Sequence, residues 1–231
     1  MSTSPAPRRI GRPPVTSRAQ ILAAARRIID DDGWERLTVR RLAQALGVGA
    51  PTLYHHVRDR EELLILLINQ HVDETLAVSL DGPPRERIIA AATTMRSSLA
   101  DWPWAAEVLT SDGFLGELGD SARGLVEAIV GGAVEAGCAP DEAVHLFRDI
   151  WYLTVGEILV RARPRRAPAT APADPGTPSR YFGDIDSRAF PALAAVGGRW
   201  PELAAQDTYG TAVAALVDAA IGAAKATATA R

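Results

Sequence analysis

Side chains that can bind metal ions or transfer protons are adjacent in the segment LGVGAPTLYHHV. Tyr54, His55 and His56 follow a short turn that is bracketed by two glycines. A phenol and two imidazoles could ligate a metal ion, act in acid–base catalysis, fill a core or contact a partner. Adjacent histidines project in different directions from a helix, and neither His71 nor any cysteine or carboxylate completes a ligand set at useful spacing. We therefore expect no metal ion and no cofactor here.

The residues around this segment predict two helices joined by a tight turn. Apolar residues recur at helical spacing from the potential N-cap Thr38 to the stop at Gly47. Pro51 suits the first turn of a second helix, because its missing N–H costs nothing there. Leu53 and Val57 are four residues apart and can both face a core. A helix, a tight turn and a short helix with a polar outer face are typical of helix-turn-helix DNA-binding domains.

Two further helices frame this pair. Ser17 and Gln20 have the spacing of a capping box, and apolar residues then recur at helical spacing until Gly33. Asp59 and Glu62 have the same capping-box spacing at the start of a later helix. That helix begins with apolar residues on more than one face, so we expect it to be buried between two modules and to couple them.

The charge of the chain is unevenly distributed. Residues 1–60 hold eleven arginines and five acidic residues, a formal charge of +6, which leaves −9 for the rest of a chain whose total is −3. A basic first quarter favours contact with nucleic acid, although a solvated basic surface would have the same composition. Residues 1–16 are rich in proline and small residues, so we expect a flexible arm whose arginines can enter a DNA minor groove: Arg8, Arg9 and Arg12.

Composition argues against several classes of protein. The single cysteine, Cys138, excludes an internal disulfide and fits a reduced, cytoplasmic setting. The longest apolar run has six residues, far below the roughly 20 of a membrane span, and the N-terminus has no apolar signal region. The chain contains no nucleophile elbow, phosphate-binding loop or dinucleotide glycine pattern, so we do not expect an enzyme.

The segments ILAAARRIIDDDGWERLTV and LTVRRLAQALGVGAPTLYHHVRDREELL resemble the N-terminal domain of the TetR family of bacterial transcriptional regulators. The resemblance is continuous over about residues 17–66. It implies an all-α homodimer with a helix-turn-helix domain at residues 17–62 and a helical regulatory domain at residues 63–231. It also implies that the dimer binds a palindromic operator as a repressor, and that a small molecule bound in the C-terminal domain releases the DNA.

The resemblance also implies particular DNA contacts. Arg40, with Thr38 beside it, matches an operator contact from the second helix, and a guanidinium can bond two guanine acceptors at once. Gly49 and Ala50 replace larger polar residues found in some members, so we expect few base contacts there. The remaining matches are base-proximal positions at Pro51 and Thr52, phosphate contacts at Tyr54, His56 and Arg60, and an open position, facing water or a base edge, at His55.

The C-terminal part reads as further helices. We expect them at residues 85–100, 121–136 and 140–161, in the short stretch FPALAAV, and from the potential cap Asp207 to the end of the chain. A proline-aromatic break at DWPWAAEVL separates two of them. A mobile, proline-rich loop is expected at about residues 163–185. We interpret the last helix and the 140–161 helix as the self-association surface of a homodimer.

A small-molecule site is expected among these helices. Such sites are concave and mostly apolar, with a few polar groups, so the ligand is expected to be largely apolar or aromatic. The candidate residues lie around the proline-aromatic break and along one helix: His71, Met95, Trp102, Trp104, Phe114, His145, Arg148, Asp149 and Tyr152. Each aromatic residue could instead belong to the core. The stretch TVGEIL and the closing helix resemble the regulatory domain of the tetracycline-repressor branch, but no set of tetracycline or magnesium ligands is recognisable. An activator, a regulator that responds to a protein partner, and a helical enzyme that uses this pocket remain alternatives.

Overall fold

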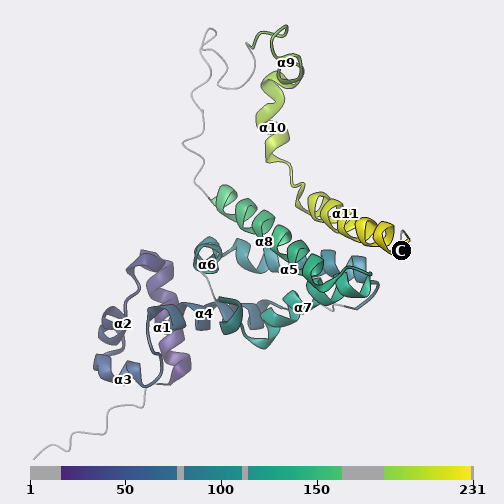
Figure 1. Ribbon diagram of the computed structural model, residues 1–231. Coiled ribbons are helices and arrows are strands. Elements are labelled where there is room, and N and C mark those ends of the chain that lie inside the picture. Colours follow the sequence, from purple (N-terminus) through teal and green to yellow (C-terminus); the bar gives the residue numbers. More distant parts are fainter. Residues whose placement is uncertain (1–16, 77–80, 111–113, 163–184, 230–231) are drawn as a thin grey trace, which may run out of the picture. The chain divides into compact units, whose positions relative to one another are not determined.

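The computed structural model describes residues 17–76, 81–110, 114–162 and 185–229. In these ranges the chain is built from helices and contains no strand, which confirms the predicted all-α class (Figure 1). The chain divides into two compact units, Met1–Gln70 and His71–Arg231. The division falls inside helix α4, Arg60–Thr75, so this one helix contributes residues to both units.

Unit 1 begins with helix α1, Arg18–Asp32, followed by the 3₁₀ turn η1, Trp34–Arg36. The capping box predicted at the start of α1 is present. The Gln20 amide N–H donates to the Ser17 hydroxyl at 3.2 Å, and the Gln20 side-chain oxygen accepts from the Ser17 N–H at 2.9 Å. Helix α2 spans Val39–Leu46 and the short helix α3 spans Ala50–Tyr54. The predicted order of helices in this part of the chain is therefore confirmed.

The core of unit 1 is formed by the apolar residues that the helical spacing selects. Leu37 and Leu42, on either side of the Thr38 cap, are both fully buried, as a hydrophobic staple requires. The inward residues of α1 are buried with them: Ile21, Leu22, Ala25, Ile28 and Ile29. This core fixes the orientation of α2 and α3 within unit 1.

Unit 2 contains the other helices. Their bounds are α5 Pro84–Ala100, α6 Pro103–Val108, η2 Phe114–Glu117, α7 Asp120–Glu135, α8 Pro140–Ala162, α9 Pro191–Val196, η4 Gly197–Arg199, α10 Trp200–Ala205 and α11 Tyr209–Thr229. The stretch expected to be only a proline-aromatic break contains α6, because Pro103 ends one helix and occupies the first turn of the next. Helix α10, with Pro201 in its first turn, was not predicted either.

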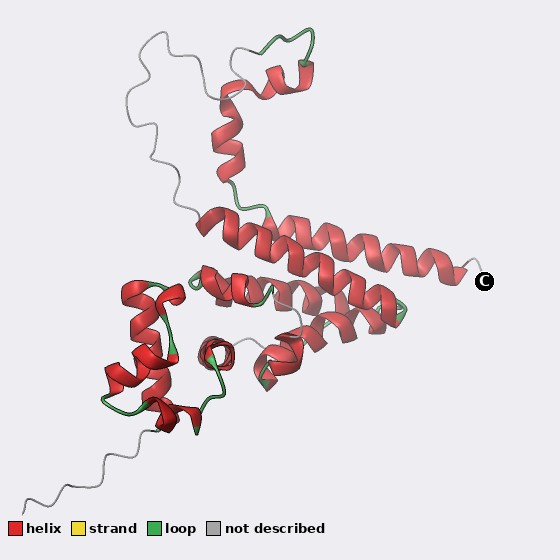
Figure 2. Ribbon diagram, turned by 60° about the vertical axis from the view of Figure 1, so that its left-hand side comes forward, coloured by secondary structure: helices red, strands yellow, loops and turns green. Residues whose placement is uncertain are grey.

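Helix α5 is central to unit 2 and packs against α7, α8 and α11. The contact with α7 is close because Gly132 has no side chain: a Cβ there would lie 2.9 Å from the Cγ1 atom of Ile88. Helix α11 runs alongside α8 in both views (Figures 1 and 2). The inward residues expected on α8 are buried: Ala143, Leu146, Phe147, Ile150 and Ile158.

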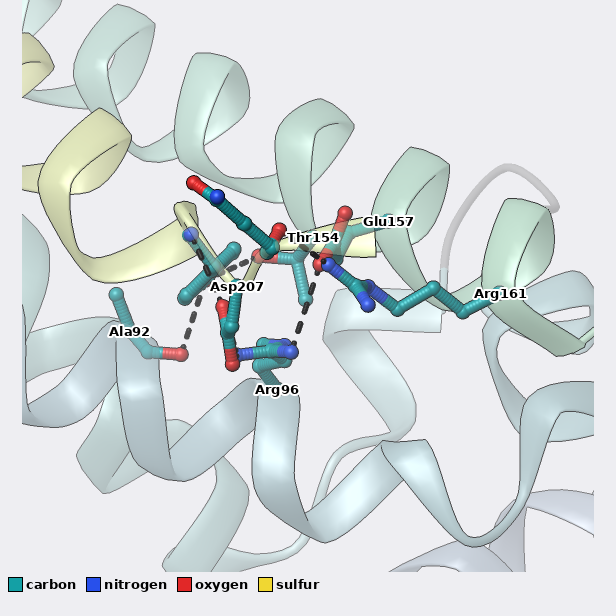
Figure 3. Close-up of polar contacts among 8 residues, drawn as sticks. Ala92, Arg96, Thr154, Glu157, Arg161 and Asp207 are labelled. Carbon is teal, nitrogen blue, oxygen red and sulfur yellow. Dashed lines mark hydrogen bonds and ion pairs between the residues drawn. The ribbon is translucent and has the colours of Figure 1, made fainter. Parts of the chain in front are cut away.

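A polar network joins α5, α8 and the start of α11 (Figure 3). The Arg96 guanidinium donates to the Asp207 carboxylate at 2.9 Å and lies over the Tyr209 ring. The hydrogen bond from Arg96 holds the pKa of Asp207 below its usual value. The Tyr209 hydroxyl lies 2.7 Å from the Thr154 hydroxyl and donates to the Ala92 carbonyl at 3.1 Å. These contacts attach the first turn of α11 to the core of unit 2.

The buried phenol of Tyr209 should make stability sensitive to alkaline pH. Burial raises the pKa of Tyr209, against weaker opposing effects from Thr154 and Arg96. A raised pKa in the folded state means that stability is fully present below the ordinary tyrosine pKa of about 10 and is lost as the pH rises through the folded value. We expect Tyr209→Phe to lose about 1 kcal/mol near neutral pH and to fall less steeply than the parent protein above pH ~10.

Urea unfolding followed by circular dichroism between neutral and alkaline pH measures this difference. Tyr54→Phe is the matched control, because Tyr54 is an exposed tyrosine that lies outside unit 2. Its pH profile should follow that of the parent protein. Equal alkaline slopes for Tyr209→Phe and the parent protein would contradict the assignment.

Candidate DNA-binding interface

The turn between α2 and α3 explains one of its two glycines. Gly47 has φ +66° and ψ +27°, a left-handed conformation that ends α2, and its N–H donates back into that helix. Gly49 has φ −74°, which other residues adopt readily, and a Cβ there would make an ordinary contact with Pro51. Gly47 is therefore needed for the turn, while Gly49 serves only as the residue that precedes α3.

Helix α3 is held to the domain by one side and exposes the other. Leu53 is fully buried and Val57 nearly so, as their spacing predicts. Tyr54 is 57% exposed, which is unusual for a tyrosine and leaves its hydroxyl accessible to a partner. Pro51, Thr52 and His55 are also exposed, and Ala50 and His56 are half-buried. The predicted outer face of this helix therefore exists, and its DNA contacts stay predictions.

Helix α2 carries two neighbouring arginines, of which the first is exposed and the second forms an ion pair within unit 1. Thr38 is the N-cap, and its hydroxyl accepts from the Arg41 N–H at 3.1 Å, which leaves the hydroxyl hydrogen available to a phosphate. Arg41 forms an ion pair with Asp32 of α1. Arg40 is exposed and forms no ion pair with any described residue. Of these two neighbouring arginines, Arg40 is the one placed to meet a partner.

Arg60 makes contacts that its predicted role as a phosphate contact did not anticipate. Its Nε atom donates to the Leu37 carbonyl at 2.8 Å, and a terminal nitrogen donates to the Trp34 carbonyl at 2.8 Å. The guanidinium also lies over the Trp34 ring, 4.9 Å from its centroid. The side chain is partly buried, and two of its five N–H donors are used inside unit 1.

Part of the predicted ligand site is gathered at one place in unit 2. The His71 ring stacks on Trp102 with centroids 4.1 Å apart, and Trp102 stacks on Trp104 at 5.2 Å. The His71 Nε2 lies 2.8 Å from the Ser98 carbonyl oxygen, which can only accept, so Nε2 carries a proton. Met95, His71 and Trp102 are buried, so these side chains form part of the core of the unit.

The predicted ligand residues on α8 lie on a different face from the core. His145, Arg148, Asp149 and Tyr152 are all exposed. Phe114 instead meets Trp151, which is buried, with ring centroids 5.5 Å apart. Trp151 is not among the predicted ligand residues. Its spacing of four residues from the inward Phe147 is the signal that could have identified it.

A hollow of about 390 Å³ lies along α7. Its lining contains none of the predicted ligand residues and consists of Arg87, Gly124, Glu127, Ala128, Gly131, Gly132 and Glu135. Arg87 forms an ion pair with Glu135 across it. The predicted arm residues Arg8, Arg9 and Arg12, and the expected loop at 163–185 apart from residue 185, lie outside the described residues.

Comparison with known proteins shows what this helix-turn-helix segment is similar to. Residues 21–67, which contain α2, the turn and α3, match the family described as bacterial regulatory proteins, tetR family. These residues are therefore similar to the DNA-binding part of tetR-family regulators. The match covers the exposed outer face of α3 and also Arg60, so the matched segment includes every residue of the candidate interface except the arm.

Named relatives and solved structures resemble longer parts of the chain. The HTH-type transcriptional repressor Rv1474c of Mycobacterium tuberculosis is 33% identical over 110 residues, 48% of this chain and 57% of the relative. The chain thus spans little more than half of that relative, and 42% of the next, a regulator of Saccharopolyspora erythraea.

Two solved structures extend the comparison. The structure of BioQ with its double-stranded DNA operator has 27% identity and a TM-score of 0.55, covering 64% of this chain and 89% of BioQ. A TetR variant of Acinetobacter baumannii in complex with minocycline has 18% identity and a TM-score of 0.57, covering 91% of this chain and 97% of that protein. At that identity the second likeness describes the fold alone.

Proposed function

We propose that this protein is a transcriptional repressor that binds a palindromic DNA operator as a homodimer. The observation that carries the proposal is the exposed outer face of α3, with Tyr54 and Thr52 accessible, in a domain that matches the tetR family. Arg40 reads a base edge from α2, and Tyr54 and His56 contact phosphates, which set register rather than sequence. The basic arm at residues 1–16 adds contacts in the adjacent minor groove.

The homodimer is proposed to form through the outward faces of α8 and α11. Helix α8 exposes apolar side chains that a monomer would leave in water: Val144, Tyr152 and Val160. Helix α11 has the length and composition of a membrane span, yet only 17% of its most apolar window is buried within one chain. Its inner residues Val213 and Val217 are buried in unit 2. A second copy of the chain would cover the remaining apolar surface without a membrane.

Release of the DNA is proposed to follow binding of a small molecule in unit 2. Minocycline bound to the TetR variant is the precedent for a ligand in this fold. The aromatic group His71, Trp102 and Trp104 supplies apolar walls, so a largely apolar or aromatic ligand suits it. Such a ligand releases DNA only if it binds the DNA-free conformation more tightly than the DNA-bound one.

Selection of bound fragments from the source genome tests the proposal. The expected result is a small set of enriched sites with two half-sites about one helical turn, or a small multiple of it, apart. Affinity for these sites should fall steeply with salt and should be weaker for a chain lacking residues 1–12. Sedimentation of the free protein measures the dimer. Enrichment no better than random genomic fragments would reject the DNA-binding function.

A further inference from the structure

Arg60 closes the helix-turn-helix segment into a loop. The residue is the first of α4, and the carbonyls that it binds belong to Trp34 and Leu37, which lie 26 and 23 positions earlier in the chain. The helices between these contacts are α2 and α3, joined by the glycine turn. One side chain therefore ties the entrance of the segment to its exit.

The hydrogen bonds from Arg60 hold the residues that lead into α2. The Leu37 carbonyl belongs to the peptide that leads into Thr38, the N-cap of α2, and Arg40 follows in its first turn. The Trp34 carbonyl also accepts the Leu37 N–H at 3.1 Å, which closes the η1 turn. Movement of Arg60 would thus free the backbone that leads into the first turn of α2.

The chemistry of the site requires arginine. A cation at the first residue of a helix is disfavoured by the helix dipole, so Arg60 would weaken α4 unless other groups stabilised its charge. Two carbonyl oxygens and the face of Trp34 supply that stabilisation. A planar guanidinium can bond two separate oxygens while it stacks on a ring, whereas a lysine ammonium is a single point of charge.

We propose that Arg60 is a positioning residue and does not contact a DNA phosphate. It sets the placement of Arg40 and of the outer face of α3. Its role rests on the proposed DNA-binding function, since the residue acts through Arg40 and the outer face of α3. Loss of Arg60 should leave the bulk electrostatic attraction to DNA in place and should reduce discrimination between operator and unrelated DNA.

Hydrogen exchange in the free protein tests the positioning role of the Arg60 contacts without DNA. In Arg60→Ala, amides of residues 34–46 should exchange about tenfold faster or more, because bonds from a charged donor are lost, while unit 2 stays unchanged. Arg60→Lys should restore little of this protection. Arg58→Ala is the matched control: it removes the same charge from an exposed side chain that is paired with Glu62. Its exchange in residues 34–46 should equal that of the parent protein.

DNA binding supplies the second measurement, and separates positioning from general destabilisation. In Arg60→Ala the operator affinity should fall, affinity for unrelated DNA at the same salt should hold, and the salt slope should stay constant. Equal losses on both DNAs would indicate a merely structural role. Unchanged exchange with a salt slope reduced by about one would make Arg60 a phosphate contact and overturn the proposal. If the parent protein binds no operator, the proposed function fails. Hydrogen exchange would still show whether the Arg60 contacts hold residues 34–46 in place. If Arg60→Ala does not fold, the same measurements are made on Arg60→Lys.

Discussion

Arg40→Ala is expected to weaken operator binding by about 1–3 kcal/mol, roughly 5- to 150-fold, and to relax specificity at one base pair of each half-site. The reason is geometric and chemical. Arg40 projects from the first turn of α2 into solvent, and its guanidinium can bond two acceptors on a guanine edge. Binding measured on operators that are substituted one position at a time locates the base pair whose discrimination is lost.

The neighbouring arginine supplies the control for this change. Arg41→Ala removes the same charge from the same helix turn, but Arg41 is paired with Asp32 and is directed toward α1. Its effect should be smaller and the same on every operator variant. Uniform weakening by Arg40→Ala, with no base pair singled out, would mean that Arg40 contacts phosphate and that specificity arises elsewhere.

Local chemistry explains why the sequence predicted unit 1 so closely. A cap, a stop and an apolar stripe are all properties of neighbouring residues. Ser17 pairs with Gln20 three positions away, and Leu53 with Val57 four positions away, so spacing alone determines both. The same locality explains the errors. The prolines and aromatic residues of DWPWAAEVL predict only a break, although proline also suits the first turn of a helix such as α6.

Contacts between distant residues could not be predicted in this way. The partners of Arg60 are backbone carbonyls more than twenty positions away, and a carbonyl has no signature in a sequence. The Tyr209 hydroxyl similarly meets Thr154 and the Ala92 carbonyl across three helices. Along α8, polar groups predict a ligand role for the stripe containing His145 and Tyr152, whereas the core uses Phe147, Ile150 and Trp151. Polarity indicates that a residue can bind a ligand but does not specify which face does so.

Leu53→Ala is expected to destabilise unit 1 by about 2–5 kcal/mol and to abolish operator binding. Leu53 is the one residue of α3 that is buried, and a five-residue helix has no stability of its own in water. Without this anchor the outer face of α3 loses its fixed position, even though every proposed DNA contact is chemically intact. Urea unfolding gives the loss of stability, and hydrogen exchange shows whether it is confined to unit 1.

Two companion variants separate anchoring from contact. Leu53→Met keeps most of the volume and should cost less than about 1.5 kcal/mol while operator binding is retained. Tyr54→Phe alters the exposed neighbour, so it should leave the free energy of unfolding unchanged and weaken binding to all DNA sequences alike. If Leu53→Ala kept the stability of the parent protein, α3 would have to be held by contacts other than its single buried side chain. The reading face would then depend on the backbone bonds of the turn, in which the Val48 N–H donates to the Ala43 carbonyl at 3.0 Å.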